Sequence, residues 1–422
     1  MLVLWWLAGS LLYLGNGTTI TDTFLNKNLT IVSYNIAMSI KGHVWGMKMI
    51  VNCRRHRYLA RGGIFLVVVA LTAGMVGCGL LPYPIPGPIP PIPDPGPSVD
   101  LEIRTWHDLD AVRDNLAGNH RLMNSLNATT PGYDELAGPT ADDGRGWYPL
   151  GDWDPYDHHL YLAFTGTFDG QGYEIADLFI DRPGAGLFRY VSEGAVIQNV
   201  ALTNATVTGG HYVGGLVALL SGTVNNCYSS GNVTGEWAVG GLVGANHGGT
   251  VSKCYSTSSV TGDRPGGFHI DEVGGLVGRN RRGTIENSYA TGIVTGNRYI
   301  GGLVGDDDGG TIRNCYFSGS LAGTYAVGGL VGGGYHRTSD RWFTVSNSFW
   351  DLQVSGIEES DGGTAKTTTE MMSTATFTDT ATEGLVEPWD LVAVAPGDTN
   401  SDHIWNIVDG KTYPFLSWQS VP

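Results

Sequence analysis

The stretch Gly240-Gly241-Leu242-Val243, which is followed by Thr250-Val251-Ser252-Lys253-Cys254-Tyr255, is one copy of a repeated unit. The Gly-Gly-Leu-Val motif recurs at spacings of 26, 34, 27 and 27 residues, beginning at Gly214, Gly240, Gly274, Gly301 and Gly328. A degenerate earlier copy, Gly186-Leu187-Phe188, precedes these. Self-similarity with a period in the twenties predicts a solenoid, in which each unit packs on its neighbours.

The units are rich in Val, Thr, Tyr and Gly and poor in residues that favour helices, which predicts β-strands. A unit of 27 residues is long enough for about three short strands with their turns, whereas a β-propeller blade needs about 40 to 45 residues. The sequence therefore predicts an all-β fold, a parallel β-helix (solenoid) of about six coils of 26–34 residues with caps at both ends.

Each copy also carries a second motif, as in Thr223-Val-Asn-Asn-Cys-Tyr228 and Thr311-Ile-Arg-Asn-Cys-Tyr316. With both motifs, the units between residues 186 and 350 resemble the GLUG repeat of bacterial surface proteins, which also occurs in regions attached to some IgA1 peptidases. The resemblance implies a β-helical fold and a place on the cell surface. It does not imply peptidase activity, because the sequence has no His-Glu-x-x-His motif.

The charge is unevenly distributed along the chain. The formal net charge is −16, but the first 77 residues hold seven Lys or Arg and a single acid, Asp22. Residues 78–422 therefore hold 17 basic and 39 acidic residues, a net charge of −22. A surface this acidic repels phosphate backbones, so we expect no nucleic acid partner.

Residues 47–77 have the parts of a bacterial lipoprotein signal peptide. Arginines between 54 and 61 precede an apolar stretch at 64–75, which is too short to span a bilayer comfortably. Met75-Val76-Gly77-Cys78 then resembles a lipobox, which implies that Cys78 is lipidated and tethers the protein to a membrane. An ordinary signal peptide and an uncleaved anchor are the alternatives.

Two further segments flank this signal. Residues 1–46 precede it, and we interpret them as an extension from a wrongly chosen start codon, with Met47 or Met49 as the true start. Residues 78–100 are a Pro-rich linker, which predicts a polyproline II spacer that lifts the following domain off the membrane. A Pro-rich ligand for an SH3-type domain is the alternative.

The solenoid needs a cap at each end, because its terminal coils would otherwise expose a sheet edge and the core. Residues 101–185 are predicted to form the N-terminal cap and the first strands, ahead of the β-helix at 186–350. Residues 351–422 are the predicted C-terminal cap. Four tryptophans are expected to cover the last coil: Trp350, Trp389, Trp405 and Trp418.

Three cysteines occupy the same slot in three of the units: Cys227, Cys254 and Cys315. Ser288 and Ser348 fill this slot in two other units. We expect a buried column of free thiols, and a disulfide between Cys227 and Cys254 is the alternative. No Cys-x-x-Cys or Cys/His spacing typical of a metal site occurs, so no metal or cofactor is predicted.

Two side-chain columns flank this slot. An asparagine precedes it at Asn199, Asn226, Asn287, Asn314 and Asn347, and Lys253 interrupts the series. Stacked amides can hydrogen-bond from coil to coil, which predicts a structural ladder. An aromatic file follows the slot at Tyr228, Tyr255, Tyr289, Tyr316 and Phe349. Alternation along a strand places it on the outer surface, where it either stacks between coils or forms a stripe that binds carbohydrate.

No residues are predicted to be catalytic. The longest unit has an insert near 263–272 that is expected to project as a loop on a binding face, and 306–308 is expected to be a second protrusion. Their acids have no Lys or Arg partner at a fixed spacing. The stretch 398–409 half-resembles a calcium loop, but His403 occupies the place where glycine is needed, which favours a solvated loop.

The sequence therefore predicts a non-enzymatic, lipid-anchored protein on the cell surface, outside the cytoplasm, whose solenoid serves adhesion or another surface interaction. Its partners would be the membrane, through the lipid, and a glycan or a surface protein. A carbohydrate-binding solenoid is the first alternative, and a polysaccharide lyase or hydrolase is the second.

Overall fold

The structure is a computed structural model that describes residues 100–151, 163–262, 271–334 and 343–419, together with the backbone of three strands near the N-terminus. The chain divides into two compact units, Met1–Ile92 and Pro93–Pro422. Within the described residues, every helix is too short or too polar to cross a membrane.

The first unit contains an antiparallel sheet in the order β1 (Thr23–Phe24), β2 (Leu29–Ile40) and β3 (His43–Arg54). Strands β2 and β3 pair along their whole length. The predicted start sites Met47 and Met49 lie within β3. The apolar stretch 64–75, the predicted lipidation site Cys78 and the Pro-rich linker up to residue 99 lie outside the described residues.

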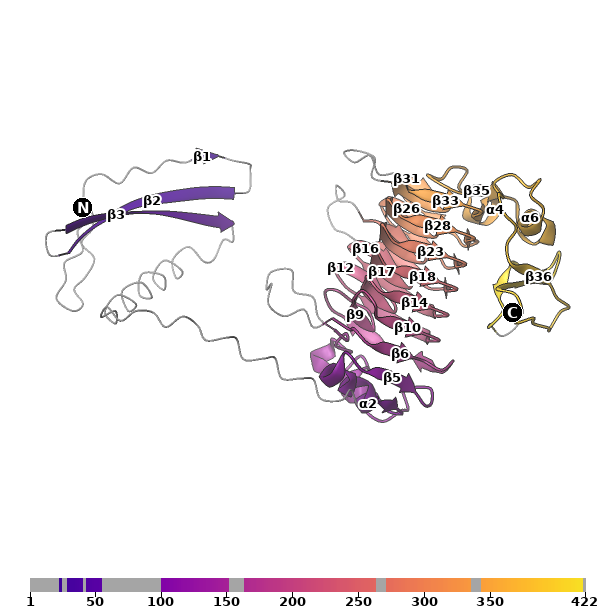
Figure 1. Cartoon of the computed structure of the whole chain (residues 1–422), viewed down its shortest axis with the longest axis horizontal. Coiled ribbons are helices and arrows are strands. Elements are labelled where there is room, and N and C mark those ends of the chain that lie inside the picture. The colour runs from indigo at the N-terminus through magenta and orange to yellow at the C-terminus, as the bar shows by residue number, and fades with distance from the viewer. Residues whose placement is uncertain are drawn as a thin grey trace. The chain divides into compact units, whose positions relative to one another are not determined.

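The second unit is a stack of coils whose strands pair in parallel from one coil to the next, which confirms the predicted parallel β-helix (Figure 1). One face is a nine-stranded sheet. Its strands are β4 (Glu102–Ile103), β5 (Asn119–Leu122), β6 (Thr167–Asp169), β10 (Val196–Gln198), β14 (Thr223–Asn225), β18 (Thr250–Ser252), β23 (Thr284–Glu286), β28 (Thr311–Arg313) and β33 (Thr344–Ser346).

The Gly-Gly-Leu-Val motifs lie between two further sheets. The six-stranded sheet contains β9 (Phe188–Val191), β13 (Val217–Leu220), β17 (Val243–His247), β22 (Val277–Arg281), β27 (Val304–Asp308) and β32 (Val331–Gly334). The five-stranded sheet contains β12 (His211–Gly214), β16 (Trp237–Gly240), β21 (Val273–Gly274), β26 (Arg298–Gly301) and β31 (Tyr325–Gly328). Glycine is required at the bend between them, because a Cβ atom on Gly240 would collide with the carbonyl oxygen of Val243.

The remaining sheet of the solenoid is twelve-stranded and carries the aromatic file. Its strands are β7 (Glu174–Ala176), β8 (Phe179–Asp181), β11 (Ala201–Thr208), β15 (Tyr228–Gly235), β19 (Tyr255–Ser256), β20 (Ser259–Gly262), β24 (Tyr289–Ala290), β25 (Val294–Thr295), β29 (Tyr316–Phe317), β30 (Leu321–Ala322), β34 (Phe349–Asp351) and β35 (Thr364–Lys366).

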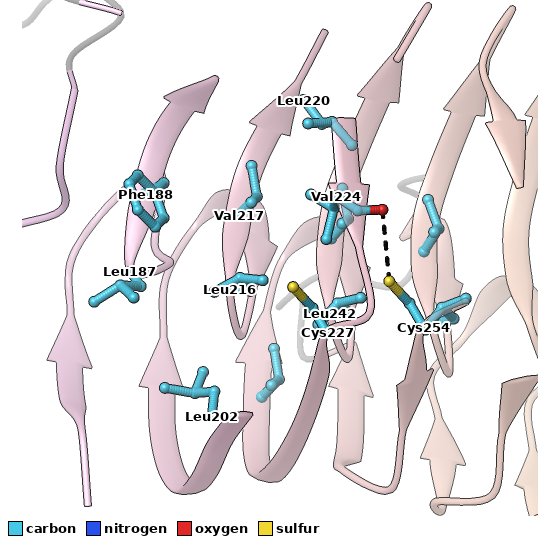
Figure 2. Close-up of a cluster of buried hydrophobic side chains, with 14 of the residues drawn as sticks. Leu187, Phe188, Leu202, Leu216, Val217, Leu220, Val224, Cys227, Leu242 and Cys254 are labelled. Carbon is cyan, nitrogen blue, oxygen red and sulfur yellow. Dashed lines mark hydrogen bonds between the residues drawn. The ribbon is translucent and has the colours of Figure 1, made fainter. Parts of the chain in front are cut away.

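The leucines of the Gly-Gly-Leu-Val motif form one interior row. Each of the first four donates its backbone N–H to the leucine carbonyl of the next coil at 2.9–3.0 Å. All five side chains are fully buried: Leu216, Leu242, Leu276, Leu303 and Leu330. Figure 2 shows Leu187, Leu216 and Leu242 in this row, with Val224 and the cysteines beside them. A continuous apolar core along the axis therefore holds the coils together.

The N-terminal end of the solenoid is closed by short helices. These are α2 (Trp106–Asp110), the 3-10 helix η1 (Ala111–Asn115), α3 (Tyr133–Leu136) and the 3-10 helix η2 (Asp142–Gly144). Thr105 and Asp108 form a capping box at the start of α2, and this fixes where the helix begins. Leu109 and Val112 are fully buried against the first coils.

The C-terminal end is closed in two stages. Helix α4 (Leu352–Ser355) and the turn before β35 cover the last coil, where the backbone N–H of Leu330 donates to Ser360 Oγ at 3.1 Å. Residues 367–419, which we name the return segment, then fold back beside the twelve-stranded sheet. They contain α5 (Thr368–Met371), α6 (Thr374–Thr378), β36 (Leu391–Ala393), β37 (Trp405–Ile407) and β38 (Phe415–Leu416) (Figure 1).

Candidate functional site

The tyrosines of the aromatic file stack face to face, one per coil. Ring centroids are 4.7 Å apart between Tyr228 and Tyr255, 5.0 Å between Tyr255 and Tyr289, and 4.7 Å between Tyr289 and Tyr316, with interplanar angles of 3–4°. Tyr255, Tyr289 and Tyr316 lie apart from the interior core, in a cluster that they share with the return segment. Coil-to-coil stacking therefore uses the ring faces and leaves the ring edges pointing outward.

The return segment covers the C-terminal half of the file. The hydroxyl of Tyr316 donates to the carbonyl oxygen of Pro414 at 2.7 Å, and Gln419 Nε2 donates to the hydroxyl of Tyr289 at 2.7 Å. Trp405 lies 6.0 Å from both tyrosine rings. Tyr289, Tyr316 and Phe349 are 6%, 2% and 0% exposed, so they cannot contact a ligand in this structure.

This covering changes the predicted ligand stripe, which required five exposed rings. Only Tyr228 and Tyr255 keep part of their surface open. The sequence led us to expect that the C-terminal tryptophans would cover the last coil. Trp350 packs with the interior core at that coil, but Trp389 and Trp405 pack against the side of the solenoid instead. Aromatic content alone does not tell which apolar surface a segment will bury.

A cleft remains where the file ends, and we name it the aromatic cleft. It has a volume of about 530 Å³ and is lined by Gln171, Gly172, Glu174, Asn199, Val200, Ala201, Asn226, Tyr228, Tyr255, Trp418 and Gln419. Ala201 pairs in register with Tyr228 of the next coil and with Glu174 of the preceding strand. Because Ala201 has only a methyl group, the file has no ring at this level, and the cleft occupies that place.

The aromatic wall of the cleft has a third ring from the return segment. Trp418 is 36% exposed, and its ring centroid lies 6.2 Å from Tyr228 and 5.6 Å from Tyr255. Burial, and then the carboxylate of Glu174, raise the pKa of Tyr228. Burial raises the pKa of Tyr255 to about 12. Both phenols therefore remain protonated at neutral pH and offer a hydroxyl group to a ligand.

A second hollow of about 540 Å³ shares Asn226 and Trp418 with the aromatic cleft. It is polar, and its other lining residues are Lys253, Asp390, Ser401, Asp402, His403, Ile404 and Ser417. His403 Nδ1 lies 2.6 Å from Asp390 Oδ1. In the stretch 398–409, which partly resembles a calcium-binding loop, the backbone N–H of Asp402 donates to Asn400 Oδ1 at 2.9 Å. Across the described ranges, no group of three or more His, Cys, Asp or Glu side chains is arranged to hold a metal ion.

The asparagine column borders the aromatic cleft and forms a partial ladder. Asn226 Nδ2 donates to Asn199 Oδ1 at 3.3 Å, and Asn314 Nδ2 donates to Asn287 Oδ1 at 3.3 Å. Asn347 is directed to the return segment instead, where its Oδ1 accepts from the backbone N–H of Val386 at 2.7 Å. The predicted ladder is thus two separate contacts, and the amide oxygens of Asn226 and Asn314 are buried without a partner.

Backbone conformation gives a second reason for asparagine in this column, which sequence reasoning missed. All five asparagines have φ between 46° and 54°, in the left-handed region: Asn199, Asn226, Asn287, Asn314 and Asn347. Asparagine tolerates this region better than most residues do. Lys253 has φ of 53° at the same place in its coil, although lysine has no such preference.

Three stretches of the solenoid, residues 235–261, 272–295 and 296–322, match the model of the GLUG motif. The repeats of this chain are GLUG repeats. The chain is 36% identical over 154 residues to Halomucin of Haloquadratum walsbyi, a match that covers 35% of this chain and 2% of that protein. It is 30% identical over 129 residues to a Gly-rich membrane protein of Evansella cellulosilytica, covering 30% of this chain and 13% of that protein.

The chain therefore spans only a small part of the length of these curated relatives. Among solved structures, a chain titled IgA1 Protease aligns with 83% of this chain and 25% of its own length, at 17% sequence identity and a TM-score of 0.47. The parallel pairing of its strands from coil to coil defines the fold of the solenoid.

The cysteine slot of the GLUG repeat is a buried column of free thiols: Cys227, Cys254 and Cys315. The alternative disulfide between Cys227 and Cys254 is not formed. Each thiol is directed to a backbone carbonyl. Cys254 Sγ lies 3.6 Å from the carbonyl oxygen of Val224, and a dashed line marks this contact in Figure 2. Burial raises the pKa of Cys315 to about 12, which makes it unreactive. Where serine fills the slot, Ser288 Oγ accepts from the backbone N–H of Cys254 at 3.0 Å.

The prediction that residues 306–308 form a protruding loop is wrong. The residues at 306–308 lie in strand β27 and not in a protruding loop, and Asp306 and Asp307 are 2% and 1% exposed. Asp271 and Glu272, at the end of the predicted insert, are also buried, while 263–270 lie outside the described residues. Because aspartate is depleted in strands, the run of three aspartates at 306–308 suggested a loop where the chain forms a strand.

These acids also have arginine partners, contrary to the prediction. Arg279 lies 3.7 Å from Glu272 and 3.7 Å from Asp306, and we name these three residues the charged cluster. Arg281 pairs with Asp308 at 3.5 Å. The register of the GLUG repeats places Arg279 beside Asp306 and Arg281 beside Asp308, so a full alignment of the units would have revealed both pairs.

The charged cluster is a buried site with perturbed protonation. Burial raises the pKa of Glu272 to about 7, and burial together with Glu272 raises that of Asp306 to about 8. Trp237 covers Arg279, whose guanidinium carbon lies 5.8 Å from the ring centroid. One cation between two buried carboxyl groups favours retention of a proton on one of them.

Proposed function

We propose that this protein is a non-enzymatic, lipid-anchored cell-surface protein that uses its GLUG solenoid for adhesion. The names of its relatives, Halomucin and a Gly-rich membrane protein, support a place at the cell surface or membrane. The lipobox at Met75-Val76-Gly77-Cys78 supports attachment through a lipid on Cys78, and the Pro-rich segment after it would hold the solenoid away from the membrane. An extracytoplasmic location follows from this proposal.

The observation that carries the adhesive role is the aromatic cleft. It combines partly exposed rings, which offer apolar contact, with amide side chains that can both donate and accept hydrogen bonds. The stacked coils hold these groups on a rigid element, so little ordering is required when a partner binds. A solenoid with a cleft on its side is suited to contact an extended partner.

A binding role is favoured over a catalytic one by the acids of the cleft. Hydrolysis of glycosidic bonds usually needs two carboxyl groups that flank the bond. Glu174 is the one acidic residue among the described residues that line the aromatic cleft. The acids that the sequence offered as candidates, Asp306 and Glu272, are buried in the charged cluster. The net charge of −22 after residue 77 disfavours nucleic acid as the partner.

The anchor is tested by expressing the full chain in a bacterial host that is supplied with a labelled fatty acid. We expect label on the wild-type protein and none on Cys78→Ser, because Cys78 provides the only thioether in the proposed linkage. Label that persists on Cys78→Ser would contradict the proposed anchor.

Adhesion is tested with cells that display the full chain at matched levels, on surfaces coated with neutral glycans, acidic glycans or extracellular matrix proteins. We expect wild-type cells to adhere to at least one surface better than cells without the protein, and Tyr255→Ala to reduce this. Tyr325→Ala, which removes an exposed ring from another sheet, is the matched control. Equal adherence of cells with and without the protein on every surface would sink the proposal.

A further inference from the structure

We infer that the aromatic cleft binds a neutral pyranose unit of a saccharide, stacked on the free face of Tyr228 at the level of Ala201. The inference rests on the proposed adhesive function and names the class of its ligand. It is carried by the way in which the aromatic file ends, by the polar groups around that end and by the charge of the cleft.

The stacking geometry defines a vacant place. The rings of the file repeat at 4.7–5.0 Å, because each coil contributes one ring in register. Tyr228 is the first ring, and its partner in the preceding coil is Ala201. A flat group placed above Ala201 would therefore continue the stack at the spacing that the file already has. The apolar C–H face of a pyranose ring is such a group, and aromatic faces attract it as they attract other rings.

The polar groups around this place suit a ring that carries hydroxyls. A sugar hydroxyl both donates and accepts a hydrogen bond, and so do the amides of Gln171, Asn199, Asn226 and Gln419, which line the cleft. Two of these amides are held in place by other contacts. Asn199 Nδ2 donates to Asp169 Oδ1 at 3.0 Å, and Gln419 Oε1 accepts from the backbone N–H of Leu416 at 2.6 Å. Gln419 Nε2 also donates to the hydroxyl of Tyr289 at 2.7 Å. These contacts fix both amides, so the cleft is preorganised, and Asn199 keeps a second N–H for a ligand.

The charge of the cleft selects a neutral sugar. Glu174 stands on the far side of the vacant place, two strands from Tyr228, and is exposed. Its carboxylate can accept a hydroxyl hydrogen bond but repels a uronate or sulfate group at the same place. None of the described residues that line the aromatic cleft is a lysine or arginine. A neutral pyranose is therefore favoured over an acidic one.

The size of the site allows more than one sugar unit. The second hollow begins on the other side of Asn226 and Trp418 and is of similar volume, about 540 Å³. A saccharide that stacks on Tyr228 can therefore extend past the exposed ring of Trp418 toward Lys253 and His403. An oligosaccharide is accordingly expected to bind more tightly than a monosaccharide.

The decisive variant fills the vacant place. Ala201→Tyr extends the file by one ring, so it should abolish saccharide binding while it keeps or raises the temperature of unfolding. Ala201→Ser leaves the place open and is the matched control. Tyr228→Ala and Trp418→Ala remove the stacking surfaces and should each weaken binding by roughly three- to tenfold. These two variants test the inference even if Ala201→Tyr fails to fold.

Binding is measured by calorimetry with the full chain in a detergent that has no sugar headgroup. The probes are neutral oligosaccharides of glucose, mannose, galactose, xylose and N-acetylglucosamine, together with oligomers of galacturonate and glucuronate. We expect at least one neutral probe to bind the wild type and Ala201→Ser, and not Ala201→Tyr. The inference is overturned if no neutral probe binds, if only the uronates bind, or if Ala201→Tyr or both stacking variants bind as the wild type does.

The same variants separate this inference from the proposed function. Cells that display Ala201→Tyr and still adhere as wild-type cells do would show that adhesion is real but does not use this sugar site. Cells that display the wild-type chain and adhere to nothing would refute the proposed function itself.

Discussion

Asn226 donates its side-chain amide to Asn199 Oδ1 over 3.3 Å, yet its own Oδ1 receives no hydrogen bond in return. In the next coil the corresponding residue is Lys253, whose ammonium group makes no hydrogen bond to Asn226 Oδ1. The amide ladder therefore stops at the edge of the aromatic cleft, and a buried acceptor is left unsatisfied. A buried polar atom without a partner costs about 1–3 kcal/mol.

Lys253→Asn is expected to repair this defect and raise the free energy of unfolding by about 1 kcal/mol. Asparagine supplies the missing N–H donor to Asn226 Oδ1 and also prefers the left-handed backbone found at Lys253. Lys253→Asp has a similar shape and backbone preference but no N–H donor, so it is the control. The ladder account predicts a higher urea midpoint for the asparagine variant than for the aspartate variant, and equal midpoints would refute it.

The leucine row could be predicted from the sequence because its period is nearly constant and its residues are apolar. The return segment could not, since nothing in the order of Trp389 and Trp405 distinguishes an end cover from a lateral one. The aromatic cleft left one trace in the sequence: the coil before Tyr228 has Ala201 where the later coils have a ring. Trp418 and Gln419 complete the cleft from a distant part of the chain, and no sequence pattern indicated that they would lie there.

The charged cluster should make stability depend on pH. In the folded protein the pKa values of Glu272 and Asp306 are about 7 and about 8, above their ordinary values of 4.5 and 3.8. The folded state therefore holds protons that the unfolded state has released between those limits. This contribution to stability is fully present below about pH 4 and is lost as the pH rises through 7 to 8.

The double variant Glu272→Gln and Asp306→Asn removes both titrating groups. Its free energy of unfolding, measured by urea titration between about pH 4 and pH 8, should fall less with rising pH than that of the wild type. Glu286→Gln, which removes a partner of the exposed side chain of Arg313, is the control and should keep the wild-type slope. Identical slopes for the double variant and the wild type would contradict the assigned role of the cluster.

Tyr316 ties the return segment to the solenoid through its hydroxyl group, which donates to Pro414. Tyr316→Phe keeps the ring stack but leaves the buried carbonyl oxygen without this donor, so it should destabilise the protein by about 1–3 kcal/mol. Tyr325→Phe removes a hydroxyl from an exposed ring and should change stability by less than about 0.5 kcal/mol. Equal effects of the two substitutions on the denaturation midpoint would argue against the contact.

The free thiols of the cysteine column should be unreactive while the protein is folded. In a Cys53→Ser and Cys78→Ser background, the thiols of Cys227, Cys254 and Cys315 remain, and all three are fully buried. We expect a thiol reagent to modify none of them in buffer and all three in denaturant. Modification of only one in denaturant would show that the other two form a disulfide.

The central claim is that the return segment covers the C-terminal half of the aromatic file and leaves its N-terminal end open. Hydroxyl-radical footprinting of the folded full chain, read by mass spectrometry at each tyrosine, measures this directly. We predict that Tyr289 and Tyr316 are protected, that Tyr325 is modified strongly, and that Tyr228 is modified to an intermediate degree. Modification of Tyr289 and Tyr316 to the same extent as Tyr325 would contradict the account.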